Sequence, residues 1–237
     1  MWLYLGGIKK MTGKRFNTFL NIVLVIVILL ILASIGFIGY DYFYKKYKNA
    51  ADAQNEIEKI DQYIAENNNL VVEVSNDPIE ESDKTENNVN NAAKTYNPNV
   101  NYGLTYRGYG VLGKIELPKV GLQYPVLETM TNAKSIDVSV AMQYGVGLNN
   151  VGNTVIIGHN YRNGTFFGSN KKLVEGDKVY ITDLSGNKVE YTIYSKYLTP
   201  QEDYSYAQRD TGGKREVTLV TCHSNNKYRL ILCAREQ

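Results

Sequence analysis

Hydrophobic side chains are concentrated in one unbroken run near the start of the chain. Residues 16–40 carry no charge, and the stretch from Ile22 to Leu32 contains only isoleucine, valine and leucine. A helix of about 20 apolar residues spans the hydrocarbon core of a bilayer. No small-residue cleavage site closes the run, so we expect an uncleaved transmembrane helix rather than a signal peptide. The alternative is a buried helix of a soluble protein.

The next segment is polar, with one narrow apolar stripe. Ile57, Ile60 and Ile64 recur at helical spacing. One thin stripe cannot build a core, so the pattern indicates a stalk or a helix that seeks a partner. Residues 66–99 are rich in Asn, Glu, Asp and Ser, a composition that favours disorder. We therefore expect a basic cytoplasmic tail, a transmembrane anchor, a stalk with an acidic disordered spacer, and a folded domain, at residues 1–15, 16–40, 41–99 and 100–237.

The last segment contains several short runs typical of strands. Residues 178–182 and 188–194 alternate apolar and polar positions, and residues 153–159 have the pattern of a buried strand. Residues 135–142 fit either a short helix or a strand. About seven short strands with few helices predict an antiparallel barrel or sandwich. The clearest runs lie at residues 112–118, 122–127, 153–159, 178–182, 188–194, 217–221 and 228–232.

The last two runs form a hairpin whose register can be derived. A turn centred on Asn225-Asn226 places His223 opposite Tyr228 and Cys222 opposite Arg229. The Cβ atoms of such a pair lie roughly 5 Å apart. A guanidinium beside a thiol favours the thiolate and can stabilise a developing oxyanion, which suits acyl transfer. The alternative is a buried cysteine near a surface arginine.

The remaining cysteine and the two histidines are the other candidates for chemistry. Cys233 pairs with Thr218 in this register, on the order of 13 Å along the strand from Cys222, too far for a disulfide. Cys222 is therefore predicted to be a free thiol. His159 ends the strand at 153–159 and could exchange protons with it, or it could be structural. His223 adjoins Cys222 and points to the opposite face of a regular strand.

Charge is segregated along the chain. Residues 1–48 have a net charge of +6, residues 49–99 of −8 and residues 100–237 of +4. The excess in the last block is small and forms no Lys/Arg run, which argues against nucleic-acid binding. The scattered acidic residues Glu175, Asp177 and Asp203 are interpreted as solvated loop charges, so no metal and no cofactor is expected.

Thr218-Leu-Val-Thr-Cys222, with Arg229 on the following strand and Gly158-His159 on an earlier one, resembles the sortase family over roughly residues 105–237. The resemblance implies a mainly β fold. It would be a closed eight-stranded β-barrel with one or two short helices, preceded by the transmembrane helix and linker. The cysteine would end the seventh strand and the arginine would lie on the eighth.

The same resemblance implies a function. Sortases are membrane-anchored cysteine transpeptidases of Gram-positive bacteria. They cleave a sorting signal such as Leu-Pro-x-Thr-Gly through a thioester and pass the protein to an amine of the cell wall or of a pilin subunit. Matched motif to motif, Cys222 is the nucleophile, His159 the general acid/base and Arg229 the oxyanion stabiliser. The N-terminus would lie inside the cell and the catalytic domain outside.

The subclass stays open between class D-like and class B-like enzymes. Residues 157–168 resemble class B, but the link at 199–215 is too short for the helical insertion of that class. No second hydrophobic anchor follows Gln237, which argues against a class C enzyme. Two other functions remain. One is a membrane-tethered, non-catalytic β-barrel that binds a partner, and the other is a different surface cysteine peptidase or an L,D-transpeptidase.

Overall fold

A computed structural model describes residues 13–74, 103–128, 133–224 and 226–237 of the chain. It divides into two compact units, residues 1–47 and 48–237. Helix α1 (Gly13–Val74) begins in the first unit and ends in the second. The predicted spacer after residue 74 lies outside the described residues, and the domain boundaries derived from the sequence stay predictions.

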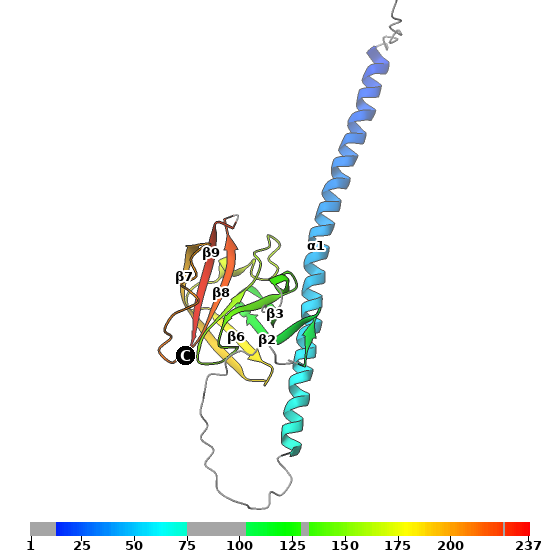
Figure 1. Ribbon diagram of the computed structural model, residues 1–237. Helices are drawn as coiled ribbons and strands as arrows, with labels where there is room; N and C mark the ends of the chain where they lie inside the picture. Colours follow the sequence, from blue (N-terminus) through cyan, green and yellow to red (C-terminus); the bar gives the residue numbers. More distant parts are fainter. Residues whose placement is uncertain (1–12, 75–102, 129–132, 225) are drawn as a thin grey trace, which may run out of the picture. The chain divides into compact units, whose positions relative to one another are not determined.

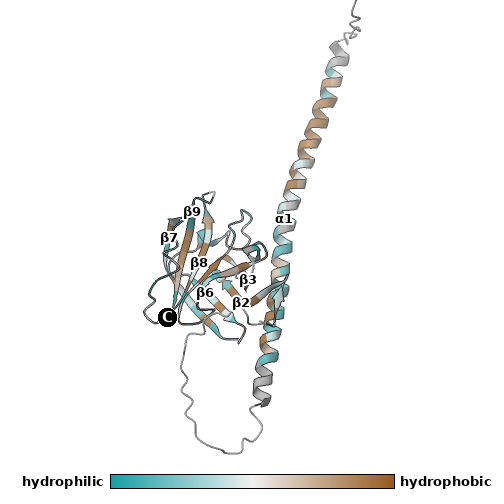
Figure 2. Cartoon of the chain, viewed as in Figure 1, coloured by the Kyte–Doolittle hydropathy of each residue, from teal (hydrophilic) through white to brown (hydrophobic). Residues whose placement is uncertain are grey.

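The N-terminal half of α1 is the apolar run. Figure 2 shows hydrophobic residues concentrated in this half and hydrophilic residues further along the helix. Side chains such as Leu30, Phe37 and Ile38 are more than half exposed on the isolated helix. Among the described residues, α1 is the one helix long and apolar enough to cross a membrane. A helix with apolar side chains on every face is stable where lipid surrounds it.

The second unit is built on a β-barrel (Figure 1). A two-residue strand, β1 (Thr105–Tyr106), forms a small hairpin with the first barrel strand. Eight strands form the barrel itself, and they are β2 (Tyr109–Leu117), β3 (Leu122–Glu128), β4 (Val140–Gly145), β5 (Gly152–Ile157), β6 (Lys178–Asp183), β7 (Lys188–Pro200), β8 (Arg215–His223) and β9 (Tyr228–Glu236). Their connections contain three short 3-10 helices, namely η1 (Pro118–Val120), η2 (Ala133–Asp137) and η3 (Asn170–Lys172).

The barrel is closed and its sheet is mixed. Neighbouring strands follow the order β2-β3-β4-β5-β8-β9-β7-β6, and β6 pairs back with β2 to complete the ring. Two of these pairs, β3–β4 and β5–β8, are parallel. The closed eight-stranded barrel is therefore confirmed, but the purely antiparallel sheet predicted from strand pattern is wrong. Alternation along a strand records which face is buried and carries no information about the direction of its neighbour.

The segment that fits either a helix or a strand contains both. Residues 133–137 form η2, and β4 starts at Val140. The barrel interior is filled by large apolar side chains in which aromatic rings sit among aliphatic residues, including Phe167, Tyr191, Ile115, Leu219 and Leu232. These inward positions alternate along the strands with residues on the outer face, so each strand contributes to the one core.

The C-terminal half of α1 packs against the outside of the barrel. Ile57 and Ile60 are 2% and 0% exposed, and they lie in one cluster with Val111 of β2, Leu127 of β3 and Ala141 of β4. Burying each isoleucine stabilises the contact by about 1.5–3 kcal/mol. The sequence predicts a stalk or a helix that seeks a partner here. In the structure the partner of the isoleucine stripe is the barrel of the same chain.

Ion pairs flank this apolar contact. Arg107 pairs with Asp52, and Lys114 of β2 pairs with Asp61. The Lys114 side chain is almost fully covered. Residues 48–67 of α1 are called the docked segment below.

A buried ion cluster fixes the loop between β7 and β8 to the outer face of the sheet. Glu216 of β8 is fully covered, and its carboxylate accepts hydrogen bonds from Arg209, Arg235 and the hydroxyl of Tyr194. Burial raises the pKa of Tyr194 to about 12, against the opposing effect of Arg209 and with a contribution from its bond to Glu216. Two arginines on one carboxylate satisfy all of its oxygen acceptors and make its burial tolerable.

The ion cluster leads to a stability prediction. Replacing Glu216 with Gln leaves two guanidinium groups without a counter-charge, and we expect a loss of about 3 kcal/mol in the free energy of unfolding. The measurement is denaturant unfolding of the full-length protein in detergent, followed by tyrosine fluorescence. Glu175→Gln, at an exposed position, is the matched control and should stay within about 0.5 kcal/mol of the parent. Equal stability of the two variants would contradict this account.

Candidate active site

The β8–β9 hairpin adopts the register derived from the sequence. Cys222 pairs with Arg229, and His223 pairs with Tyr228. Cys222 thus lies at the end of the seventh barrel strand and Arg229 near the start of the eighth. The turn between them needs left-handed backbone, with φ of 47° at Ser224 and 70° at Asn226. Asparagine adopts this conformation more easily than most residues, which explains why it suits the turn.

His159 is placed beside the same hairpin by the parallel pairing of β5 and β8. Ile157 pairs with Val220, so two residues further on His159 reaches the level of Cys222. Hydrogen bonds continue beyond the end of β5. The Gly158 amide donates to the Val220 carbonyl, the Thr221 hydroxyl donates to the Gly158 carbonyl, and the Asn160 side chain donates to the Cys222 carbonyl at 2.7 Å. These bonds hold the C-terminal ends of β5 and β8 together at the place where the chemistry would occur.

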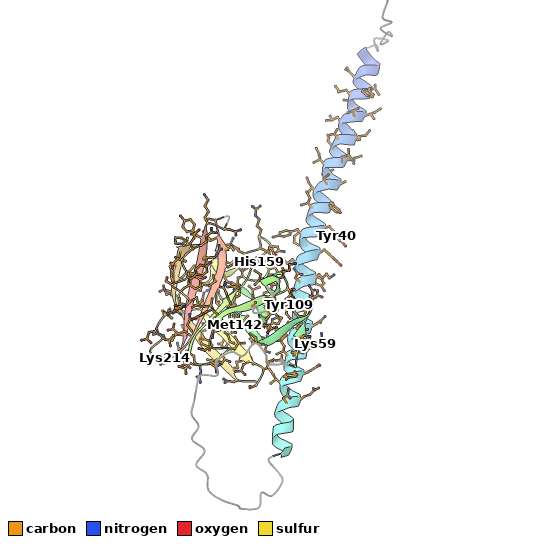
Figure 3. The ribbon with its side chains drawn as sticks, in the orientation of Figure 1. Tyr40, Lys59, Tyr109, Met142, His159 and Lys214 are labelled. Atoms are coloured by element: carbon orange, nitrogen blue, oxygen red, sulfur yellow. The ribbon has the colours of Figure 1, made fainter. Side chains whose placement is uncertain are left out.

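The three residues singled out from the sequence line one cavity. His159, Cys222 and Arg229 surround a hollow of about 210 Å³, and the His159 and Cys222 side chains are both partly exposed to it. Figure 3 shows His159 toward the end of the barrel opposite to Lys214, which precedes β8. Other residues that line the cavity come from β4, β5, β8, η2 and the β7–β8 loop, including Ile136, Gln143, Ile157, Val220, Tyr204 and Tyr206.

A second hollow continues from the first. Its volume is about 590 Å³, and it shares Gln143, Tyr204 and Tyr206 with the cavity at Cys222. The tyrosines belong to the β7–β8 loop, which Asn153 holds by donating hydrogen bonds to the carbonyls of Tyr206 and Ala207. The pKa of Tyr206 is raised by burial and by Tyr204, while Arg229 opposes the change. The hydroxyl is therefore neutral at physiological pH and can donate a hydrogen bond.

The imidazole of His159 has a partner that the sequence did not suggest. Its Nε2 atom lies 2.8 Å from Oδ1 of Asp137 in η2. The ring also lies 5.0 Å from the ring of Tyr161, whose pKa is raised by burial and then by the Asp137 charge. Asp137 falls in the segment that periodicity left undecided between helix and strand, so no sequence signal placed its carboxylate.

The guanidinium of Arg229 is oriented by its own hairpin. Its Nη1 atom donates to the carbonyls of Asn226 and Tyr228 at 3.1 and 3.3 Å. These bonds involve one of the two terminal nitrogens, so the planar group retains donors that could bind another oxygen. A cation held beside a thiol at the rim of a cavity can stabilise negative charge that develops on a bound carbonyl.

The other two candidates are set apart from the cavity, as the register predicts. Both cysteines are free thiols, and Cys233 pairs with Thr218 on the hairpin. Cys233 is buried, and Arg209 Nη1 donates to its sulfur at 2.8 Å. His223 does not line the cavity at Cys222. No group of three or more His, Cys, Asp or Glu side chains within the described residues could hold a metal ion. That no metal or cofactor is required stays a prediction.

Comparison with known proteins identifies relatives of this domain. The family model for the sortase domain matches residues 115–237. Sortase A of Bacillus anthracis is 31% identical over 116 residues, covering 48% of this chain and 53% of that protein. Sortase A of Listeria monocytogenes is 29% identical over 113 residues, covering 47% and 49%. The chain therefore spans about half the length of the curated relatives it matches.

Two solved structures are also similar to part of this chain. The lid mutant of sortase A from Corynebacterium diphtheriae is 25% identical with a TM-score of 0.47, covering 54% of this chain and 71% of that one. The Listeria monocytogenes sortase A structure is 25% identical with a TM-score of 0.49, covering 54% and 87%.

The glycine before His159 allows a close contact that a larger residue would break. A Cβ atom at Gly158 would lie 2.9 Å from side-chain carbons of Phe167 and Val140, both buried. Such overpacking costs about 1–3 kcal/mol, so we expect Gly158→Ala to lower the thermal midpoint of the full-length protein in circular dichroism. The control is Gly110→Ala, where the three atoms nearest to the added methyl, at 3.0–3.2 Å, all belong to the flexible side chain of Glu128. Equal midpoints for the two variants would show that the site relaxes without cost.

Proposed function

Because the chain belongs to the sortase family, a family of cysteine transpeptidases, we propose that it cleaves an LPxTG-like sorting signal through a thioester on Cys222. The protein that carries the signal is then transferred to an amine of the cell wall or of a pilin subunit. The observation that carries this proposal is the meeting of His159, Cys222 and Arg229 at one cavity. These residues come from three different strands or strand ends, so their convergence is a property of the fold.

The first half-reaction forms the thioester. Sulfur attacks the threonine carbonyl of the signal while the thiol proton passes to His159. The tetrahedral adduct then expels the amine of the following glycine, which takes a proton from the imidazole as the C–N bond breaks. In the second half-reaction the acceptor amine attacks the thioester carbonyl and gives its proton to His159. The thiolate leaves, is reprotonated, and the thiol is restored.

Arg229 stabilises the charge on the carbonyl oxygen in both half-reactions. It faces Cys222 across the hairpin, and the carbonyls of Asn226 and Tyr228 hold its Nη1 in place. A donor that is already oriented needs no reorganisation when the oxyanion forms. Preorganisation of this kind supports a role in the transition state rather than in binding alone.

The neighbouring hollow offers room for the rest of the signal. Five residues in extended conformation span about 17 Å, more than a 210 Å³ cavity can hold. The second hollow, which shares Gln143, Tyr204 and Tyr206 with the first, extends the available surface. Tyrosine side chains offer apolar faces for aliphatic and proline residues together with hydroxyl donors for peptide carbonyls.

The apolar half of α1 supports anchorage of the enzyme in the cell membrane. The proposed topology places the N-terminus inside and the catalytic domain on the outer surface, where sorting signals and wall amines are found. The bias of basic residues that favours this orientation is slight, since Lys9, Lys10, Lys14 and Arg15 precede the helix and Lys45, Lys46 and Lys48 follow it.

Membership of the sortase family favours the enzyme over the other functions considered. A non-catalytic binding module would have no need for a partly exposed thiol, an imidazole and a guanidinium around one hollow. A different cysteine peptidase or an L,D-transpeptidase would share the nucleophile, but the matched domain of residues 115–237 is a sortase domain.

The transferase activity can be tested with the full-length protein in detergent. A panel of LPxTG-like peptides with triglycine as acceptor should give cleaved, triglycine-capped product and an acyl-enzyme detectable by mass spectrometry. Cys222→Ala should abolish both. We expect Arg229→Ala to lower kcat about 100-fold, the scale found when one oxyanion donor is lost. Cys233→Ala, at the other thiol, should keep the activity. Absence of the acyl-enzyme with every peptide would refute the proposal.

The topology can be tested with the two native thiols. Cys222 is partly exposed and Cys233 is buried, so a membrane-impermeant maleimide added to intact cells should label the protein at Cys222 alone. The label should disappear in Cys222→Ala. Labelling that requires cell lysis would place the domain on the inner side of the membrane.

A further inference from the structure

The imidazole of His159 is held from one side by a single carboxylate. Asp137 Oδ1 lies 2.8 Å from Nε2, and the Asp137 side chain is 61% exposed while that of His159 is 29% exposed. A carboxylate accepts a proton and cannot donate one when ionised, so Nε2 must be the protonated nitrogen in this contact. In the neutral ring this leaves Nδ1 with its lone pair. Nδ1 is therefore the nitrogen that can exchange a proton with Cys222.

Hydrogen bonds attach the turn that carries Asp137 to the barrel. The Val138 and Ser139 amides donate to the Ser135 carbonyl, and the Ser139 hydroxyl donates to the Pro125 carbonyl of β3 at 2.6 Å. These bonds fix the backbone after Asp137, where β4 begins.

Side chains on either side of Asp137 add apolar packing. Ile136 and Val138 pack against the cluster that contains Ile57 and Ile60 of the docked segment. Ile136 also lines the cavity at Cys222. The docked segment and η2 thus belong to one apolar cluster, which they share with β2, β3 and β4, and η2 also contributes to the catalytic cavity.

We propose that Asp137 is a positioning residue for His159 and that the docked segment of α1 acts on the reaction by holding Asp137 in place. This inference rests on the proposed function, since it assigns the acid/base role to His159. The docked segment then contributes to catalysis as well as to the packing of the domain. Its isoleucine stripe supports the imidazole through η2.

Kinetics of the full-length protein in detergent test the first link. Asp137→Ala removes the acceptor and frees the ring, and we expect kcat to fall about 10-fold, part of the 10²–10⁴-fold range of general acid/base catalysis, with KM unchanged. Asp137→Asn keeps an oxygen acceptor of the same shape and should recover most of the loss. Asp210→Asn, at an exposed carboxylate in the β7–β8 loop, is the matched control. An unchanged or higher kcat in Asp137→Ala would overturn the proposal.

A double-mutant cycle tests the second link. Ile60→Ala should lower kcat about threefold in the parent, a coupling of the size found between contacting residues, and should cause no further loss in Asp137→Ala. Glu58→Ala, on the exposed face of the same helix, should change neither. Equal losses from Ile60→Ala in both backgrounds would show that the helix does not act through Asp137. Ile60→Val, a smaller change, replaces Ile60→Ala if circular dichroism shows that the latter unfolds.

A spectroscopic measurement keeps this inference separate from the proposed function. The chain has two histidines, so ¹⁵N-histidine spectra with a His223→Gln reference assign the ring of His159. Neutral His159 should be protonated at Nε2 in the parent and should become a mixture of tautomers in Asp137→Ala. Loss of the preference in Asp137→Ala without any transferase activity in the parent would uphold the positioning and reject the function. The same tautomer in both proteins would reject the positioning.

Discussion

The parallel pairing of β5 with β8 is the contact on which the site depends. The two strands are far apart in sequence, and β6 and β7 lie between them along the chain. Parallel neighbours run in the same direction, so their C-terminal ends meet at one end of the barrel. The C-terminal end of β5 leads to His159, and the C-terminal end of β8 carries Cys222. A different neighbour for β5 would separate the base from the nucleophile even if every strand formed as it does.

The barrel protects this pairing from both sides. β5 is also bonded to β4, and β8 to β9, so neither strand has a free edge along which its register could slip. A slip of one residue would turn every side chain to the opposite face, at the cost of removing residues such as Ile156 and Leu219 from the core. The geometry of the site is therefore maintained by burial within the barrel, and the bonds from Thr221 and Asn160 only refine it.

Features that depend on residues close together in the sequence could be predicted, and features that depend on contacts between distant segments could not. The Cys222–Arg229 pair belongs to one hairpin, where turn length alone determines the register, and it is confirmed. The apolar run of α1 could also be predicted, because its length and its composition are properties of one continuous segment. The position of His159 relative to Cys222, the parallel strands and the carboxylate of Asp137 all depend on contacts between distant segments. No local sequence pattern predicts these three features. The resemblance to the sortase family implied only that His159 acts together with Cys222.

The isoleucine stripe shows how a correct local reading can leave the partner unknown. Periodicity places Ile57, Ile60 and Ile64 on one helical face, but a face of three residues fits a neighbouring molecule as well as the same chain. In the structure the isoleucine face packs against the same chain, on the outer surface of β2, β3 and β4. There Val111, Leu127 and Ala141 point away from the barrel interior. Strands that are covered on both faces bury residues at successive positions. They therefore lack the alternation of apolar and polar residues that is typical of a sheet with one exposed face. β2 is buried at almost every position, because the barrel core covers one of its faces and the docked segment covers the other.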